Sequence, residues 1–198
     1  MTDVNAPAAR LLVFAPLRVE RAAVRRGLPG ALVLRSGMGA ARSRAAALAG
    51  ARLPADAVAV VGFCGAVAAG LRPGDVVVAG EVRGPEGVTA CETQPVVAAL
   101  AALGVENVRV GPVVSADHVV RGAERAALAA QGALAADMES AWLAPAALGR
   151  PFAVLRIVLD APERELSRPL ATLAGGLTAW RALRRAAPAL ALWARGRG

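Results

Sequence analysis

The stretch Ala135-Ala136-Asp137-Met138-Glu139-Ser140-Ala141 places two carboxylates two residues apart, after one short apolar run and before another. This pattern predicts a strand over residues 133–135 and a helix that begins at the acids. If Asp137 caps that helix, Glu139 lies in its first turn and points back toward the edge of a sheet. A carboxylate there can accept two hydrogen bonds at once, as the two neighbouring hydroxyls of a ribose require. The alternative is that the acids only complement the helix dipole.

Apolar runs alternate with amphipathic stretches on both sides of this segment. Strands are expected at residues 11–15, 32–34, 57–63, 76–79, 108–114, 133–135 and 152–159. Helices are expected at residues 18–26, 40–53, 95–103, 121–131, from the acidic stretch to about 148, and from 169 to about 194 with interruptions at 175–176 and 188. Glycine and proline predict a turn at 62–65, a loop with a short irregular strand over 80–92, and a strand break at 111–112. This alternation predicts one α/β domain over residues 1–198, with three layers: a mostly parallel or mixed central sheet and helices on both faces.

The composition is that of a folded protein with few aromatic residues. Hydrophobic residues make up 56% of the chain and charged residues 19%, so disorder is not expected. Aromatic residues make up only 3% and Tyr is absent, so the core must be built from Ala, Val and Leu. All 23 basic residues are Arg, and the net charge of +8 favours an anionic partner. The arginines do not alternate with aromatic residues, so nucleic-acid binding is not supported.

Cysteine, histidine and hydropathy patterns exclude several other classes. Cys64 and Cys91 lack metal-ligand spacing and His118 is the single histidine, so neither a metal site nor another cofactor is expected. No secretory signal is visible, and the longest uncharged run, residues 57–71, is too short to span a bilayer. We therefore expect a cytoplasmic protein.

Polar and glycine residues follow the ends of the predicted strands. In a mostly parallel sheet, ligands bind beyond the carboxyl ends of the strands. The residues in those positions are Glu20, Ser36, Gly37, the 62–65 turn, Ser115, Asp117, Glu139 and Asp160. Six such segments at one edge of the sheet predict a pocket.

Six motifs in a fixed order carry a family resemblance. They are Ala15-Pro16-Leu17-Arg18-Val19-Glu20, Ser36-Gly37-Met38-Gly39, Gly62-Phe63-Cys64-Gly65 with Pro73-Gly74-Asp75-Val76-Val77-Val78, Ser115-Ala116-Asp117, Ala136-Asp137-Met138-Glu139-Ser140 and Leu155-Arg156-Ile157-Val158-Leu159-Asp160. From residue 11 to about 165 the chain resembles the nucleoside phosphorylase/nucleosidase superfamily, particularly its methylthioadenosine/adenosylhomocysteine nucleosidase branch. The short length and the Asp-Met-Glu-Ser and Arg-x-x-Leu-Asp forms are most similar to the hopanoid-associated phosphorylases, which are thought to remove adenine from adenosylhopane. No motif matches the segment after Ser167.

The resemblance implies roles for four residues. Asp160 would be the general acid that protonates N7 of the departing purine, and burial at an apolar strand end would help it to hold its proton. Glu139 would hold the ribose hydroxyls, and Met138 would pack on the apolar face of the sugar. Glu20 would orient the attacking water of a nucleosidase. From the residues alone, Asp160 can equally begin a turn, Met138 can be a core residue, and Glu20 can be a solvated acid in a first helical turn.

The remaining substrate-binding residues implied by the resemblance are Ser36, Gly37, Gly39, Gly65, Ser115 and Asp117. The backbone N–H groups of residues 36–39 at a helix start suit a phosphate or a hydroxyl. Arg156 lies inside an apolar strand, so we expect it to pair with a buried acid and support the site. Two positions depart from the nucleosidase pattern: Leu159 replaces a serine that helps to orient the acid, and Val119 replaces an aromatic residue that packs on the purine.

The predicted function is cleavage of the N-glycosidic bond of an adenine nucleoside, of the adenosylhopane type in hopanoid biosynthesis, with release of adenine. One alternative is a hydrolytic nucleosidase for methylthioadenosine, adenosylhomocysteine or a futalosine-like compound. Another is a catalytically silent nucleoside-binding protein. No cofactor is expected, although a phosphorylase would use phosphate as co-substrate. The expected partners are the nucleoside and further copies of the chain, with transient contact to a membrane surface if the substrate is a lipid.

Overall fold

The computed structural model describes residues 10–161 and 169–196, so residues 162–165, where the family resemblance ends, lie outside the described residues. The elements follow one another as β1 (Leu11–Ala15), α1 (Arg18–Gly27), β2 (Leu32–Arg35), α2 (Ala40–Ala51), β3 (Ala57–Ala66), β4 (Val76–Gly84), β5 (Gly87–Ala90), α3 (Gln94–Ala102), β6 (Val108–Ser115), α4 (Gly122–Ala130), β7 (Ala135–Asp137), α5 (Ser140–Leu143), the short 3₁₀ helix η1 (Ala144–Ala147), β8 (Phe152–Asp160), α6 (Pro169–Ala186) and α7 (Pro188–Arg195).

The strands form one mixed sheet in the order β2-β1-β3-β7-β6-β4-β5, and β8 pairs with both β3 and β4. The β1–β2, β1–β3, β3–β8, β4–β6 and β6–β7 pairs are parallel, whereas β3–β7, β4–β8 and β4–β5 are antiparallel. Because β3, β8, β4, β6 and β7 pair in turn and β7 pairs again with β3, these strands close into a ring. The sequence does not predict this closure.

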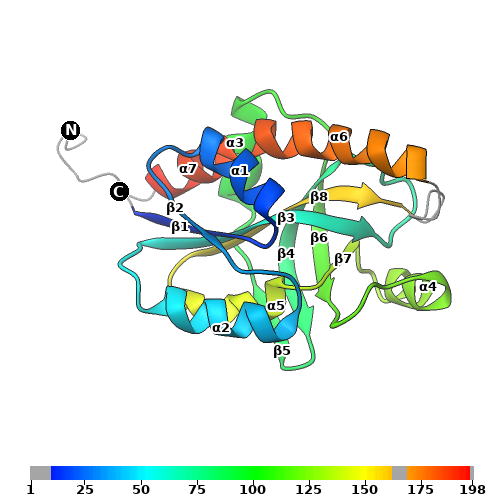
Figure 1. Cartoon of the computed structure of the whole chain (residues 1–198), viewed down its shortest axis with the longest axis horizontal. Helices are drawn as coiled ribbons and strands as arrows, with labels where there is room; N and C mark the ends of the chain where they lie inside the picture. The colour runs from blue at the N-terminus through cyan, green and yellow to red at the C-terminus, as the bar shows by residue number, and fades with distance from the viewer. Residues whose placement is uncertain (1–9, 162–168, 197–198) are drawn as a thin grey trace.

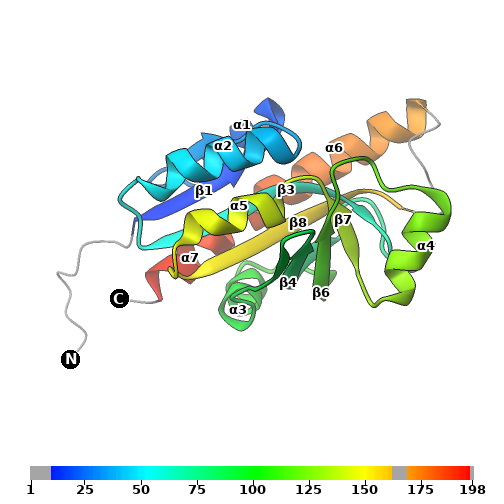
Figure 2. The same cartoon turned by 90° about the horizontal axis from the view of Figure 1, so that it is seen from below.

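Helices cover both faces of the sheet (Figure 1), as the predicted three-layer arrangement requires. One layer contains α1, α3, α6 and α7, and the other contains α2 and α5 with η1; Figure 2 shows the second layer from below. Both faces of β1 are buried, since Leu11 and Val13 pack under the first layer while Leu12 and Phe14 pack under the second. A strand covered on both faces has a continuous apolar sequence, which explains why β1 was predicted with its observed bounds.

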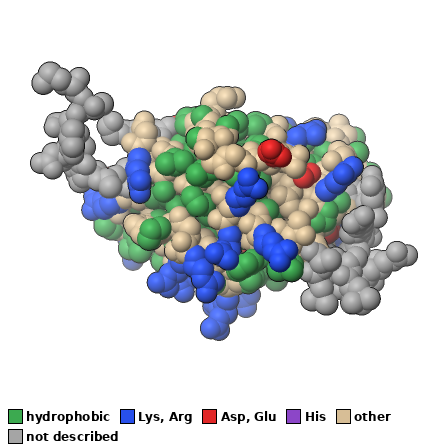
Figure 3. Space-filling model, turned by 90° about the horizontal axis from the view of Figure 1, so that it is seen from above, with side chains coloured by type: hydrophobic (Ala, Val, Ile, Leu, Met, Phe, Trp, Pro, Cys, Tyr) green, Lys and Arg blue, Asp and Glu red, His purple; other side chains and the backbone are tan. Residues whose placement is uncertain are grey.

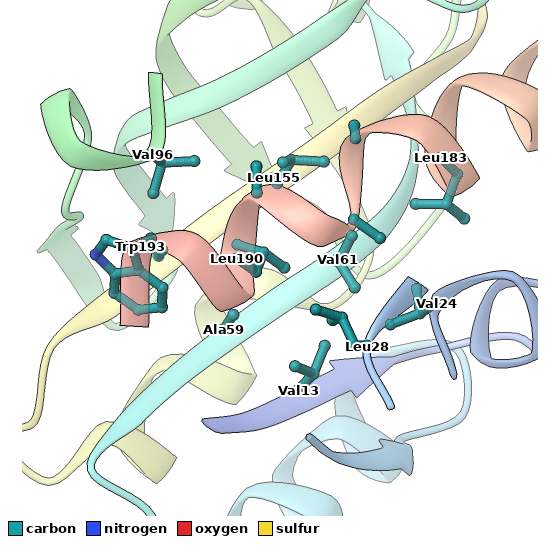
Figure 4. Close-up of a cluster of buried hydrophobic side chains, with 14 of the residues drawn as sticks. Val13, Val24, Leu28, Ala59, Val61, Val96, Leu155, Leu183, Leu190 and Trp193 are labelled. Atoms are coloured by element: carbon teal, nitrogen blue, oxygen red, sulfur yellow. The ribbon is translucent and has the colours of Figure 1, made fainter. Parts of the chain in front are cut away.

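Small aliphatic side chains build most of the core, as the composition predicts. Figure 4 shows Leu190 and Trp193 of α7 packed over the sheet near Ala59 of β3 and Leu155 of β8. Trp193 is among the largest fully enclosed side chains. Burying an aliphatic or aromatic side chain of this kind stabilises the fold by roughly 1.5–3 kcal/mol. The C-terminal helices, which lie after the segment that carries the family resemblance, are therefore part of the core.

Two predictions based on glycine and proline in strands are wrong. Residues 62–65 do not turn; they continue β3, and the glycines there allow close approach of other side chains rather than a bend. β6 is not broken at Gly111-Pro112. Pro112 lies where the pairing of β4 with β6 skips between Ala79 and Val82, so its missing N–H costs no ladder hydrogen bond.

Three further predictions need correction. Residues 80–92, predicted as a loop with a short irregular strand, do contain a short strand, β5, but β4 also continues to Gly84, and the two strands pair as a hairpin. The predicted helix from the acidic stretch to about 148 is the short α5 followed by η1, with Pro145 near the point where the geometry changes. Helix α6 continues through Gly175-Gly176, whereas the predicted interruption at Pro188 is confirmed because α7 begins there.

Arginine dominates the charged surface on the face that carries α1, α6 and α7 (Figure 3). An open groove is lined by four arginines, Arg18, Arg21, Arg25 and Arg35. Such a surface attracts anions. No helix in the described ranges is both long and apolar enough to cross a bilayer.

Candidate active site

A cavity of about 200 Å³ lies at the carboxyl ends of β3 and β8. The segments that follow β1, β2, β6 and β7 also contribute to its wall, so the predicted meeting of segments at one edge of the sheet is observed. The lining residues are Pro16, Leu17, Glu20, Met38, Phe63, Cys64, Gly65, His118, Val119, Val120, Arg125, Ala136, Asp137, Met138, Glu139, Leu159 and Asp160.

The most deeply buried charge at this site is Arg156, whose side chain comes from the middle of β8 and is 0% exposed. Its Nη2 atom lies 2.8 Å from Asp137 Oδ2 and 3.5 Å from Glu139 Oε2. It also donates to the Ser140 hydroxyl at 2.8 Å. The expectation that Arg156 pairs with a buried acid is therefore confirmed. An arginine without such partners would be costly at this depth.

Asp137 ends β7, and Glu139 is the N-cap residue of α5, so the prediction that Asp137 caps the helix with Glu139 in its first turn is wrong by two residues. The Asp137 side chain nevertheless binds backbone N–H groups where α5 begins. Its Oδ1 atom accepts the backbone N–H groups of Glu139 at 3.0 Å and Ser140 at 3.1 Å. The hydroxyl of Ser115 donates to the same oxygen at 2.6 Å. Ser115 therefore acts through Asp137 and does not line the cavity. These contacts fix the position from which Glu139 points into the cavity.

Glu139 is a buried carboxylate with two weak contacts. The Gly39 N–H donates to its Oε1 atom at 3.4 Å, and Arg156 approaches its other oxygen. Burial raises the pKa of Glu139 from 4.5 to about 7, while the positive charge of Arg156 lowers it in part. A carboxylate held this loosely retains the capacity to accept further hydrogen bonds.

Glu20 is only 2% exposed, so it is not a solvated helix acid. Its Oε1 atom accepts the Phe63 N–H at 2.7 Å, and its Oε2 atom accepts the Leu17 N–H at 2.6 Å. Burial raises the pKa of Glu20. A Cβ atom at Gly62 would lie 2.7 Å from Glu20 Oε1 and 2.9 Å from Arg156 Nη1, so only glycine allows both side chains to approach β3.

Asp160, the last residue of β8, also lines the cavity. It forms an ion pair with Arg125 that the sequence did not predict. Arg125 Nη2 of α4 lies 2.7 Å from Asp160 Oδ2. A Cβ atom at Gly65 would lie 2.9 Å from Asp160 Oδ1, so this glycine also serves close approach. Nothing in the local sequence distinguishes Arg125 from the other arginines, because its partner is 35 residues away.

The other predicted residues divide into those that line the cavity and those that do not. Met138 and Gly65 line it. Ser36 and Gly37 lie in the turn after β2 and are not lining residues, and the Gly39 N–H is used by Glu139. Asp117 is exposed and bonds to His118 at 2.7 Å, and only His118 of this pair reaches the cavity.

Cys64 is the cysteine among the lining residues of the cavity. Cys64 lines the cavity but is buried, and burial raises the pKa of its thiol, which disfavours the reactive thiolate. Within residues 10–161 and 169–196, no cluster of His, Cys, Asp and Glu side chains has the arrangement of a metal site.

The fold is shared with solved nucleosidase structures. S-adenosylhomocysteine nucleosidase from Streptococcus pyogenes, in complex with 5-methylthiotubericidin, is 20% identical with a TM-score of 0.76, over 98% of this chain and 99% of that one. The 5′-methylthioadenosine/S-adenosylhomocysteine nucleosidase from Colwellia psychrerythraea, in complex with adenine, is 21% identical with a TM-score of 0.76, over 97% and 98%. The Campylobacter jejuni enzyme of the same name is 14% identical with a TM-score of 0.80, over 95% and 99%.

Sequence comparison identifies the family. No functionally curated protein sequence matches the chain significantly. A family model described as the phosphorylase superfamily matches residues 27–174, which is most of the chain and includes all of the cavity lining except Pro16, Leu17 and Glu20. The chain therefore belongs to the phosphorylase superfamily, and it is an enzyme of the nucleoside phosphorylase or nucleosidase class that its motifs resemble.

Proposed function

We propose that the chain cleaves the N-glycosidic bond of an adenine nucleoside with an apolar 5′ substituent, of the adenosylhopane type, and releases adenine. One observation carries this proposal: four buried carboxylates from three different segments line a single cavity, namely Glu20, Asp137 with Glu139, and Asp160. The structurally similar Colwellia nucleosidase binds adenine, which supports adenine as the base.

The charges around Arg156 suit the reaction at the ribose. Three carboxylates, those of Asp137, Glu139 and Glu20, act on this one buried cation. Cleavage of the N-glycosidic bond builds positive charge on the sugar, and a surplus of fixed negative charge stabilises that charge as it develops. In this proposal Glu139 binds the ribose hydroxyls, with Met138 beside the sugar, and Glu20 orients the attacking group.

The apolar mouth of the cavity supports an apolar 5′ substituent. Met38 is 51% exposed and Val119 is 49% exposed, and both line the cavity together with Leu17. Large apolar side chains exposed around a binding site mark it as a surface that a partner or ligand covers. If the substrate is a lipid, the nearby arginine groove on α1 would favour transient contact with an anionic membrane surface.

We further propose that water, not phosphate, is the attacking group. Phosphate beside Glu20 would face a carboxylate, and like charges at close range repel by several kcal/mol even at an effective dielectric constant of about 20. Arg125 is the one arginine among the described residues that line the cavity, and it is already paired with Asp160. The Gly39 N–H, which the turn after β2 would offer to phosphate, already points to Glu139.

Adenine release with and without added phosphate tests the function and the attacking group together. We expect equal rates in both buffers and a sugar product with a free anomeric hydroxyl, from both a 5′-methylthio and a long 5′-alkylthio adenosine. A ribose 1-phosphate product would instead show a phosphorylase. Cleavage of the short substrate alone would overturn the adenosylhopane type of substrate, and tight nucleoside binding without adenine release would show a silent binding protein.

Activity should rise with pH toward a plateau above about pH 7. Glu139 must be charged to accept two hydroxyl hydrogen bonds, and burial raises its pKa to about 7, so the active form increases as pH rises through that value. The raised pKa of Glu20 acts in the same direction. The profile of kcat/KM between about pH 5 and pH 9 measures this effect. A flat profile across neutrality would contradict the assignment of a charged Glu139.

A further inference from the structure

Asp137 is a buried acid whose two side-chain oxygens bind other groups of the protein. Its side chain is 0% exposed. The Oδ1 atom accepts the Ser115 hydroxyl at 2.6 Å and the backbone N–H groups of Glu139 and Ser140. The Oδ2 atom accepts the Ser140 hydroxyl and lies 2.8 Å from Arg156 Nη2. Asp137 can therefore influence a bound ribose only through these neighbours.

Arg156 lies between Asp137 and Glu139 and is closer to Asp137. Its Nη2 atom is 2.8 Å from Asp137 Oδ2 but 3.5 Å from Glu139 Oε2, which is longer than an ordinary N–H···O hydrogen bond. The Ser140 hydroxyl accepts from Arg156 Nη2 at 2.8 Å and from its Nε at 3.2 Å. The Phe63 carbonyl accepts from Nη1 at 3.4 Å. The guanidinium is thus bound mainly to Asp137 and Ser140, and Glu139 receives a long contact.

Asp137 and Glu139 compete for this one cation. A carboxylate that pairs closely with a guanidinium uses the lone pairs that would otherwise accept hydrogen bonds from a ligand. Burial and the negative charges of Asp137 and Glu20 raise the pKa of Glu139, whereas the positive charge of Arg156 lowers it. The position of the guanidinium therefore decides both the charge of Glu139 and its capacity to bind. The other titratable residues that line the cavity are Cys64, His118, Arg125 and Asp160.

We propose that Asp137 is a positioning residue that holds Arg156 away from Glu139, so that both oxygens of Glu139 remain available to the ribose hydroxyls. This inference rests on the proposed function for the identity of the group that Glu139 binds. The closer bond of Arg156 goes to Asp137, which faces no ligand. At 3.5 Å the guanidinium still favours the charged form of Glu139 that two hydroxyl donors require.

Asp137→Asn tests the inference by removing the competing charge. The asparagine oxygen can still accept the N–H groups of Glu139 and Ser140, so the start of α5 keeps its hydrogen bonds. Its nitrogen cannot accept from Arg156, so the guanidinium should turn to Glu139. The pKa of Glu139, about 7 in the wild type, should then fall by about one unit or more. Carbon-13 NMR of the labelled glutamate carboxyl groups measures this titration, and Glu139→Gln identifies the signal.

Turnover provides the second measurement. With Glu139 occupied by Arg156, kcat/KM at pH 8 should fall by about 10- to 100-fold, the scale of one hydrogen bond to a charged group. The acidic limb of the pH profile should move to lower pH together with the Glu139 titration. Ser115→Ala is the matched control, because it removes a hydrogen bond to Asp137 and keeps every charge. Its Glu139 titration should match that of the wild type.

An unchanged or raised Glu139 pKa in folded Asp137→Asn would overturn the inference, since Asp137 would then be only structural. Asp137→Ser is the second variant if asparagine prevents folding. Its hydroxyl can also bind backbone N–H groups at a helix start, and it should shift the titration in the same direction. An unchanged titration in this variant would equally overturn the inference. The NMR measurement needs no turnover, so a wild type that releases no adenine would overturn the proposed function alone.

Discussion

Replacing Glu139 by glutamine is expected to reduce kcat/KM by about 10²- to 10⁴-fold. The carboxylate would accept hydrogen bonds from both ribose hydroxyls, and each hydrogen bond to a charged group contributes about 1.5–3 kcal/mol. Glutamine keeps the size of the side chain and can still accept from the Gly39 N–H, but it lacks the negative charge. Initial rates of adenine release from a 5′-alkylthio adenosine measure the loss.

A 2′-deoxy substrate separates the binding role of Glu139 from an indirect one. Without the 2′ hydroxyl, one of the two hydrogen bonds cannot form in either protein, so the glutamine substitution should cost much less on this substrate. Burial raises the pKa of Glu139, which means that the folded protein disfavours its charged form. Replacing it by glutamine should therefore not lower the melting temperature at pH 8, and this measurement is the control for folding. Equal losses on the ribose and deoxyribose substrates would show that Glu139 only positions other groups.

The largest expected effect on stability follows replacement of Arg156 by methionine. This change leaves Asp137 and Glu139 buried without their shared cation, and breaking a buried ion pair typically costs about 3–5 kcal/mol. For a chain of this size, each 1 kcal/mol shifts the melting temperature by roughly 2–4 °C. We therefore expect a fall on the order of 10 °C, measured by calorimetry at neutral pH.

Two companion variants make this result specific. Arg44→Met removes an exposed ion pair with Glu86 and should cost less than about 1 kcal/mol. Asp137→Asn combined with Arg156→Met removes one of the uncompensated charges and should recover part of the stability. If Arg156→Met is as mild as Arg44→Met, the buried charges are not coupled as the distances indicate.

Strands such as β1 and β3 were predictable because each is a long apolar run, whereas the short and exposed β5 was not predicted as a separate strand. The glycines within β3 led to the wrong prediction of a turn at residues 62–65. Glycine occurs both in turns and where another group approaches a strand closely, and the sequence alone does not distinguish the two. At Gly62 and Gly65 the reason is close approach, by Glu20 with Arg156 and by Asp160 with Arg125. The two glycines belong to β3, but the side chains that require them come from other segments of the chain.

The candidate site was predictable where a residue type conflicts with its surroundings. Arg156 in an apolar strand and the acids at residues 137 and 139 stand out in this way. Arg125 does not, because an arginine on a short helix is ordinary until the fold places α4 beside the end of β8. Ser115 and Asp117 are two residues apart in one motif, yet the buried Ser115 hydroxyl bonds to Asp137 while the Asp117 side chain faces solvent.

The closed ring of strands limits how the site can rearrange during a reaction. Glu139 follows β7, Arg156 and Asp160 belong to β8, and Gly62 and Gly65 belong to β3, all of which are strands of the ring. A strand in a ring cannot slide without disrupting its neighbours on both sides. The charges at the site therefore keep their spacing as the glycosidic bond breaks, and the reorganisation energy that water would require in bulk solution is largely avoided. The rest of the cavity wall, from α1, α4 and the turns after β1 and β2, lies outside the ring.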